Sequence, residues 1–112
     1  MNKVVKFGGS SLASAEQFKK AARIIRKDES RRYVVPSAPG KRTPGDTKVT
    51  DMLYRCYNLA TMDDEYEEEF EEQMSAIRAR YDEITEGLGL SIDLSDEFKT
   101  IRTMFRQKAE RD

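Results

Sequence analysis

The sequence of 112 residues contains no histidine and only one cysteine, Cys56. A lone cysteine excludes an internal disulfide, and the shortage of both residue types argues against a structural zinc site, which takes four Cys or His ligands. No N-terminal apolar run has the length of a signal peptide or of a transmembrane helix. We therefore expect a cytoplasmic protein that has no membrane partner and no structural zinc, and no metal-binding residue is assigned.

The chain also lacks an excess of charge of either sign. Its 20 basic and 21 acidic residues leave a net charge of −1, although 37% of the residues are charged. Without a global field, neither nucleic acid nor an anionic membrane is expected as a partner. A chain of this length is one domain at most and can bury a modest hydrophobic core.

Residues 2–37 carry the pattern of a β-α-β unit. Residues 2–7 are short and β-branched, which predicts a strand, and a helix is expected from Ser14 to Glu29. Ser14 and Gln17 have the spacing of a capping box. Apolar residues recur on one face of this helix at Phe18, Ala21, Ala22 and Ile25. Residues 33–37 form a nearly continuous apolar run, which is typical of a strand covered on both faces in a parallel sheet.

The rest of the chain is expected to be helical after a loop. Residues 38–47 hold two prolines and two glycines among polar residues, which predicts a loop that stays mobile until a ligand binds. Three helices are expected after it: residues 50–60, a long amphipathic helix from residue 63 to the glycines at 87 and 89, and a last helix opened by Ser95 or Asp96.

The two later helices carry apolar stripes. The stripe residues are Tyr66, Phe70, Met74, Ile77, Tyr81, Ile84 and Leu88, then Phe98, Ile101, Met104 and Phe105. We interpret them as core or as the seam of an antiparallel helix pair, with a dimer contact as the alternative. The acidic run from Asp63 lacks the loop glycine and spacing of an EF-hand, and acidic residues favour the start of a helix, so we interpret it as solvated surface.

A lysine and a glycine-rich turn follow the first predicted strand directly. Val4–Leu12 reads Val-Val-Lys-Phe-Gly-Gly-Ser-Ser-Leu, so Lys6 precedes Gly8 and Gly9. Adjacent glycines let the backbone approach a ligand, and consecutive N–H groups can form an anion-binding nest. The P-loop spacing GxxxxGK[ST] is absent. The stretch therefore predicts a different kind of phosphate site, and an ordinary strand-to-helix turn beside a surface lysine is the alternative.

This motif resembles the N-terminal signature of aspartate kinases, within the amino acid kinase superfamily. Two later segments resemble that family's next blocks in the same order: Val34–Arg42 reads VVPSAPGKR and Asp46–Leu53 reads DTKVTDML. Pro36 stands where an aliphatic residue is more usual. The resemblance is strong over residues 1–60 and implies an α/β fold, namely the N-terminal βαβ portion of an amino acid kinase-type parallel-sheet sandwich followed by an amphipathic helical segment.

The resemblance implies transfer of the γ-phosphoryl group of ATP to the side-chain carboxylate of L-aspartate. The product would be 4-phospho-L-aspartate, at the first step toward lysine, threonine and methionine. The implied site residues are Lys6 as the catalytic cation, Lys6, Phe7, Gly8, Gly9 and Ser10 for binding the nucleotide, and Ser37 and Thr50 for binding aspartate. Mg²⁺ would accompany ATP, although no ligand for it is assigned in this chain.

Two of these assignments have plainer alternatives. Thr50 could serve only as the N-cap of its helix, and Lys41 and Arg42 are expected to lie on a solvated loop. The absence of histidine is compatible with the chemistry, because a carboxylate with a pKa of about 3.9 is already ionised at neutral pH and needs no base.

Aspartate kinases are several times longer, so the resemblance implies that residues 1–112 are the N-terminal part of a catalytic domain. Residues 1–60 would be its phosphate- and substrate-binding βαβ portion and residues 61–112 a helical hairpin-like segment, with the rest of the domain and the regulatory ACT domains absent. We expect this fragment to be inactive alone and, because its sheet edges are unpaired, to form a homo-oligomer. The alternatives are a sibling kinase acting on glutamate, acetylglutamate or carbamate, or a non-catalytic helical interaction module.

Overall fold

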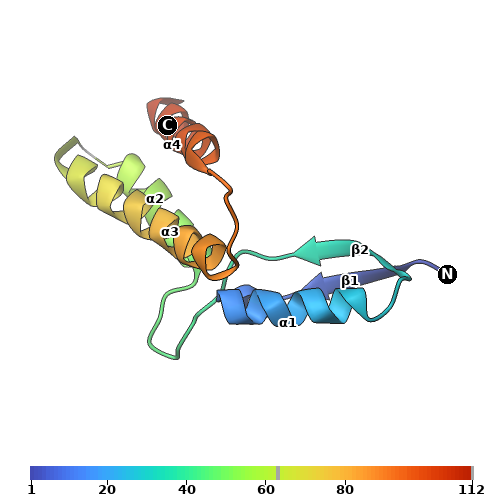
Figure 1. The fold of residues 1–112 in the computed structure, drawn as a ribbon. Helices are drawn as coiled ribbons and strands as arrows, with labels where there is room; N and C mark the ends of the chain where they lie inside the picture. The colour runs from blue at the N-terminus through green and yellow to red at the C-terminus, as the bar shows by residue number, and fades with distance from the viewer. Residues whose placement is uncertain (63, 112) are drawn as a thin grey trace.

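The computed structural model describes residues 1–62 and 64–111, which form two parts that meet near the middle of an elongated molecule (Figure 1). One part contains β1 (Lys3–Phe7), the 3₁₀ turn η1 (Gly9–Leu12), α1 (Ala15–Arg26) and β2 (Arg31–Pro36). The other contains α2 (Val49–Ala60), the 3₁₀ turn η2 (Asp64–Tyr66), α3 (Glu67–Gly87) and α4 (Ser95–Arg111). No helix in the described ranges is long and apolar enough to cross a membrane.

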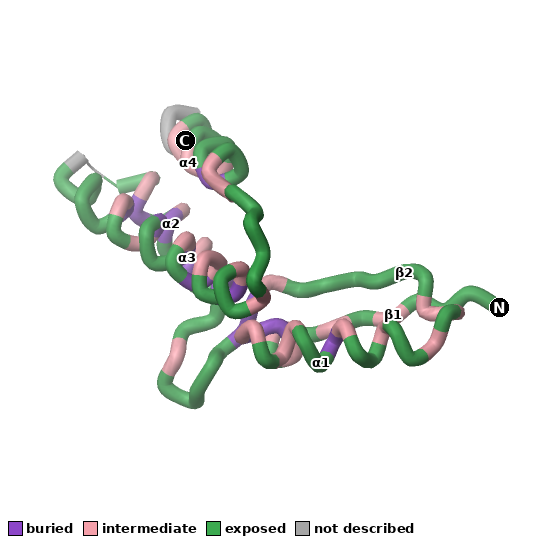
Figure 2. Tube along the Cα trace, viewed as in Figure 1, coloured by how far each residue is buried: buried purple, intermediate pink, exposed green. Residues whose placement is uncertain are grey.

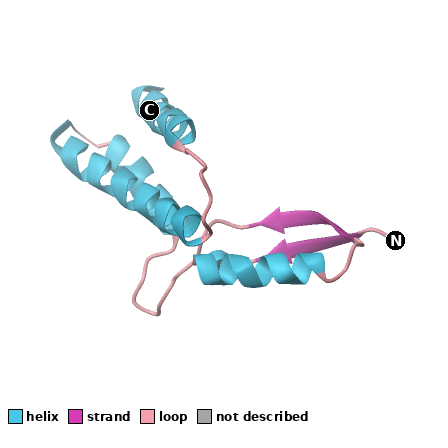
Figure 3. Ribbon diagram, in the orientation of Figure 1, coloured by secondary structure: helices cyan, strands magenta, loops and turns pink. Residues whose placement is uncertain are grey.

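The first part is the predicted βαβ unit. β1 and β2 are parallel neighbours, with Lys6 opposite Val35 and Phe7 opposite Pro36, and α1 runs along them (Figure 3). The expectation that the second strand is covered on both faces is wrong for this chain. Its apolar residues Tyr33, Val34 and Val35 are 57%, 41% and 45% exposed, and the tube of β2 is accordingly coloured as exposed in Figure 2. The reason is that α1 is one helix and cannot cover both faces of the strands.

Local hydrogen bonds set both ends of α1. Ser14 Oγ accepts from Gln17 N at 3.4 Å, so the predicted N-cap is confirmed. The helix ends earlier than predicted because Asp28 Oδ1 organises a turn, accepting from Ser30 N at 2.9 Å and from Ser30 Oγ at 2.6 Å. Lys3 Nζ also donates to Asp28 Oδ2 at 2.7 Å. The hydrogen bonds from Lys3 and Ser30 hold the pKa of Asp28 well below its usual range.

The second part has the larger hydrophobic core, made where α2, α3 and α4 meet. Its buried residues are Val49, Met52, Cys56, Leu59, Phe70, Met74, Ile77 and Phe98. α2 and α3 pack along each other, and α4 adds two edge-on ring contacts, Phe105 against Phe70 and Phe98 against Tyr81. Burial raises the pKa of the Cys56 thiol to about 11. The interpretation of the long-helix stripe as core is thus confirmed at its centre.

Two stripe residues are not core. Met104 is 62% exposed and Tyr66 is 37% exposed, which corrects their expected place on the buried faces. In α4 the contact follows Phe98, Ile101 and Phe105, and Met104 lies roughly 100° around the helix from Phe105. Met104 therefore points away from the seam with α3.

The start of α3 faces basic residues of α4. Glu71 accepts hydrogen bonds from Arg102 at 3.0 Å and from Arg106 at 2.9 Å, and Arg106 also pairs with Glu67. The side chains of Glu67 and Glu71 remain 53% and 41% exposed, so both lie on the solvated surface as interpreted, and they also pair with cations of the partner helix. Asp63, where the run begins, lies outside the described residues. Within the described ranges, no three Asp, Glu, His or Cys side chains form a group that could hold a metal ion.

Phe70 gives a direct test of the helical core. Phe70→Ala should lower the free energy of unfolding by about 3–5 kcal/mol, because a side chain that is 2% exposed would leave a cavity. Tyr54→Ala is the matched aromatic control on α2, since Tyr54 is 71% exposed and should cost about 0.5 kcal/mol or less. Urea unfolding followed by circular dichroism measures both, and equal losses would contradict the assigned core.

Candidate functional site

Six of the predicted site residues gather where the two strands end. β1 and β2 are parallel, so their carboxyl ends lie at the same edge, which is where ligands bind open α/β sheets. Lys6 and Phe7 close β1, Gly8 and the first residues of η1 follow, and Ser37 follows β2. Lys6, Ser10 and Ser37 are exposed and Phe7 is half-buried. The structure thus places an exposed amine and two exposed hydroxyl groups along one edge.

The turn of residues 8–11, here called the Gly-Gly turn, packs backbone against backbone. Ser11 N donates to Gly8 O at 3.1 Å, and Gly40 N donates to Gly9 O at 2.8 Å. A Cβ atom on Gly40 would lie 2.6 Å from the carbonyl carbon of Gly9, so no side chain fits there. A Cβ atom on Gly8 would meet nothing within 4 Å. The turn is therefore closed on its Gly40 side and open at Gly8, where a ligand could approach.

Thr50 is joined to this turn indirectly. It is an exposed residue in the first turn of α2, whose N-cap is Lys48, so the alternative that Thr50 is the N-cap is wrong. Val49 N donates to Pro39 O at 2.9 Å, which ties the start of α2 to the segment that follows Ser37. Thr50 also lines an apolar groove of about 490 Å³ together with Leu53, Tyr54, Tyr57 and Phe105.

Arg80, which the sequence reasoning missed, lies at the junction of these segments. Its side chain is 4% exposed and comes from the middle of α3. Its Nη2 donates to Gly40 O at 2.7 Å and to Ala13 O at 3.3 Å, and its Nη1 donates to Thr47 O at 3.0 Å. A signal was present in the sequence, because Arg80 falls between Ile77 and Ile84 on the apolar stripe, where a charged residue needs buried partners.

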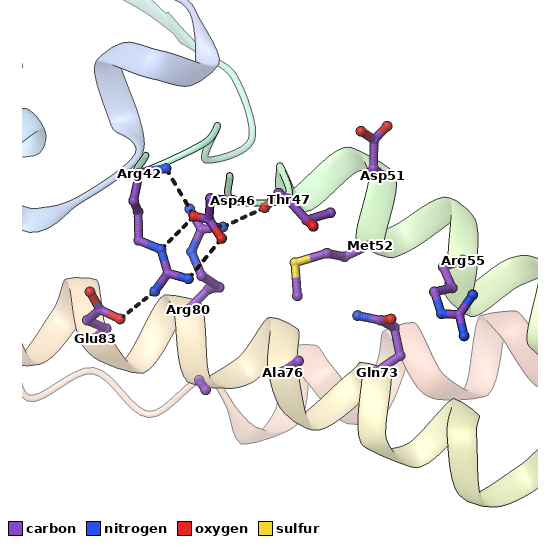
Figure 4. A pocket seen from close by; sticks show the side chains of 11 residues that line it. Arg42, Asp46, Thr47, Asp51, Met52, Arg55, Gln73, Ala76, Arg80 and Glu83 are labelled. Carbon is purple, nitrogen blue, oxygen red and sulfur yellow. Dashed lines mark hydrogen bonds and ion pairs between the residues drawn. The ribbon is translucent and has the colours of Figure 1, made fainter. Parts of the chain in front are cut away.

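The loop of residues 38–47 is held by ion pairs. Arg42 Nε and Nη2 donate to the two carboxylate oxygens of Asp46 at 2.6 and 3.0 Å, and Arg42 Nη1 donates to Glu83 on α3 at 2.8 Å (Figure 4). Arg80 Nη1 lies 3.6 Å from Asp46 Oδ2. The hydrogen bonds from Arg42 hold the pKa of Asp46 well below its usual range. Arg42 lies on an exposed loop, as expected, and in addition it donates hydrogen bonds to acidic side chains of the loop and of α3.

A pocket of about 530 Å³ opens beside this ion-pair cluster, between the loop, α2 and α3 (Figure 4). It is lined by Arg42, Asp46, Thr47, Asp51, Met52, Arg55, Gln73, Ala76, Ala79, Arg80 and Glu83. None of the predicted nucleotide-binding or aspartate-binding residues lines it, so it is distinct from the edge that carries Lys6.

The sequence model of the amino acid kinase family matches residues 1–103. The chain belongs to the amino acid kinase family. This match covers the βαβ unit with its Gly-Gly turn, then α2, α3 and the first half of α4.

Two relatives are aspartate kinases. Within this amino acid kinase chain, 54 residues are 59% identical to Aspartokinase 3 of Bacillus subtilis (strain 168), covering 48% of the chain and 12% of that protein. The crystal structure of Clostridium acetobutylicum aspartate kinase matches with a TM-score of 0.81 and 39% identity, covering 93% of this chain and 23% of that one. The predicted resemblance and the α/β fold class are confirmed. The chain spans less than a quarter of either relative's length.

The two glycines on either side of the turn make a matched pair of tests. Gly40→Ala should lower the thermal unfolding midpoint by several degrees, because the new methyl group would collide with the Gly9 backbone. Gly8→Ala should leave the midpoint nearly unchanged, since the space is open and its φ of −75° suits alanine. Thermal unfolding followed by circular dichroism measures both. A Gly8→Ala loss as large as that of Gly40→Ala would show that the turn is packed differently.

Proposed function

We propose that this amino acid kinase chain is the N-terminal part of the catalytic domain of an aspartate kinase. The enzyme would transfer the γ-phosphoryl group of ATP to the side-chain carboxylate of L-aspartate and form 4-phospho-L-aspartate, in the first step toward lysine, threonine and methionine. One observation carries the proposal: Lys6 and the Gly-Gly turn lie at the carboxyl edge of two parallel strands, in a chain whose relatives include Aspartokinase 3.

The proposed chemistry needs cations and positioning more than it needs a base. The attacking carboxylate of aspartate is ionised at neutral pH, since its pKa is about 3.9. The difficulty is to bring this anion to the anionic γ-phosphate in line with the leaving oxygen, while charge develops on the transferred group. A site without histidine can therefore perform the reaction.

Lys6 is the proposed catalytic cation. Its exposed amine, at the end of β1, can follow the transferring phosphoryl group and neutralise the charge on its oxygens. Phe7, Gly8, Gly9 and Ser10 would bind the β- and γ-phosphates, with backbone N–H groups and the Ser10 hydroxyl as donors. The open space at Gly8 supports this assignment, because phosphate oxygens could approach the backbone there.

Magnesium is proposed to arrive with ATP, bound to its phosphates. The residues that the structure describes contain no cluster of acidic, histidine or cysteine side chains that could hold a metal. No step of the reaction is therefore assigned to a metal held by this chain.

Ser37 and Thr50 are the proposed contacts for aspartate. Ser37 is exposed just after β2, close along the chain to the Gly-Gly turn's partner Gly40. Thr50 is exposed in the first turn of α2, where the positive end of the helix dipole favours an anionic ligand. The substrate carboxylates would lie between these hydroxyl groups and the phosphate that Lys6 contacts.

The whole enzyme is proposed to be a cytoplasmic homo-oligomer. Residues 1–60 would bind phosphate and substrate, residues 61–112 would support them from the side of α3, and regulatory ACT domains would belong to the rest of the protein. The isolated chain is proposed to be inactive, because it would surround ATP and aspartate on one side only.

The experiment is a coupled assay of ADP release on the full-length enzyme, with and without L-aspartate. Lys6→Ala should lower kcat by on the order of 10²–10³, because one preorganised charge at the transferring group is lost. Lys20→Ala is the control, since Lys20 is an exposed lysine in the middle of α1. Its kcat should stay within about twofold of wild type.

Three results would contradict the proposal. Turnover that depends on glutamate, acetylglutamate or carbamate but not on aspartate would indicate a sibling kinase. No turnover and no ADP binding by the intact protein would favour a helical interaction module. An unchanged kcat in Lys6→Ala would remove Lys6 from the mechanism.

A further inference from the structure

We propose that Arg80 is a positioning residue that holds the Gly-Gly turn and the start of α2 in one fixed arrangement. This inference rests on the proposed function, in which the turn binds the phosphates of ATP and the start of α2 binds aspartate. Arg80 touches neither ligand in this scheme. It acts through the backbone carbonyl groups of Ala13, Gly40 and Thr47.

The contacts of Arg80 reach three separate segments. Ala13 directly follows η1, Gly40 follows Ser37 by three positions, and Thr47 directly precedes Lys48, the N-cap of α2. Their carbonyl oxygens lie 3.3, 2.7 and 3.0 Å from the guanidinium nitrogens of Arg80. One side chain therefore contacts the backbone next to each predicted binding element.

Planar peptide geometry transmits these contacts to the site. In a trans peptide the C=O and the following N–H point in opposite directions. The hydrogen bond from Arg80 to the Gly40 carbonyl therefore also fixes the direction of the following N–H, which belongs to Lys41. On the other side of the same residue, Gly40 N donates to Gly9 O at 2.8 Å. Fixing the Thr47 carbonyl in the same way orients the backbone that enters α2 two residues before Val49. The Gly-Gly turn and the start of α2 are thus both positioned relative to Arg80.

The guanidinium suits this role better than an amine does. Its five donors form a rigid planar fork, whereas the lysine ammonium is a compact charge on a flexible stem. The three acceptor carbonyls belong to separate segments of the chain, and the Arg80 side chain is 4% exposed. A lysine at position 80 would therefore leave at least one carbonyl without its present partner. Asp46 Oδ2, at 3.6 Å, balances the buried charge and is itself held by Arg42.

The element that carries Arg80 is anchored against the same region. α3 runs from Glu67 to Gly87, and a Cβ atom placed on Gly87 would lie 2.5 Å from Ala15 Cβ at the start of α1. Glu83, one turn after Arg80, accepts a hydrogen bond at its Oε2 from Arg42 Nη1 of the loop, at 2.8 Å. α3 therefore meets the βαβ unit and its loop at several points along its last two turns, and Arg80 does not move independently of them.

The test compares Arg80→Lys with Arg78→Lys in the full-length enzyme. Arg78 is a matched control, because it lies on the same helix and also makes polar contacts, but to Ser95 at 2.8 Å and Asp93 at 3.7 Å in the segment before and at the start of α4. We measure kcat, the KM for ATP, the KM for aspartate, and ADP binding by calorimetry. All are measured at a temperature where circular dichroism shows each variant fully folded.

The expected result is that Arg80→Lys raises both KM values and weakens ADP binding, each by about tenfold, because charge-assisted hydrogen bonds that place both ligand sites are lost. Arg78→Lys should change each by less than about twofold. A variant that is less heat-stable yet keeps wild-type KM values and ADP affinity would overturn the proposal, since Arg80 would then be only structural. A change confined to one substrate would overturn the claim that one guanidinium places both sites.

The design separates this inference from the proposed function. If the wild-type protein binds ADP but turns over without aspartate dependence, the proposed substrate fails, and ADP affinity still decides whether Arg80 places the turn. If the wild-type protein binds no ADP, both proposals fail. Arg80→Gln, which keeps two amide donors without the charge, replaces Arg80→Lys if that variant does not fold. If neither folds, Arg80 is a folding residue and the positioning role is overturned.

Discussion

The buried guanidinium of Arg80 is the contact on which the placement of the βαβ unit against the helices depends. A buried charge costs several kcal/mol unless hydrogen bonds and an opposite charge compensate for it. Here the compensation comes from the carbonyls of Ala13, Gly40 and Thr47 and from the carboxylate of Asp46. Because these groups belong to separate segments, the cost is offset only when all of them are in place. Burial of Arg80 and assembly of the candidate site are therefore one event.

Small residues make this junction possible. Gly9 and Gly40 touch through their backbones, and Gly87 packs on Ala15 with no space for a larger residue. These close approaches bring carbonyl groups within reach of an arginine that projects from α3. The core of the helical part lies elsewhere, around Phe70, Met74 and Ile77. The junction is thus built from polar backbone contacts, and the helical part is stabilised mainly by apolar packing.

The features that follow from local patterns were predictable from the sequence. Strand, turn and helix succeed one another over residues 2–29 because β-branched residues, two glycines and a capping serine act within a few positions of each other. The missed features are long-range pairings. Arg80 meets acceptors 33 to 67 positions away, and Arg106 meets Glu67 across 39, so no local spacing specifies either partner. Periodicity indicated that position 80 is buried, but it could not say against what.

Lys6 and Arg80, two cations at the candidate site, differ in burial, and the difference fits the way in which each side chain can act. Lys6 is exposed at a strand end, so its amine is free to turn toward a ligand and to follow charge as it moves. Arg80 directs Nη1 and Nη2 at carbonyls of the protein and is nearly sealed from solvent. It cannot rotate toward a phosphate without leaving those carbonyls unpaired, at a cost of about 1–3 kcal/mol for each. In the proposed mechanism, the mobile cation would act on the reacting group while the immobile one keeps the surrounding backbone in place.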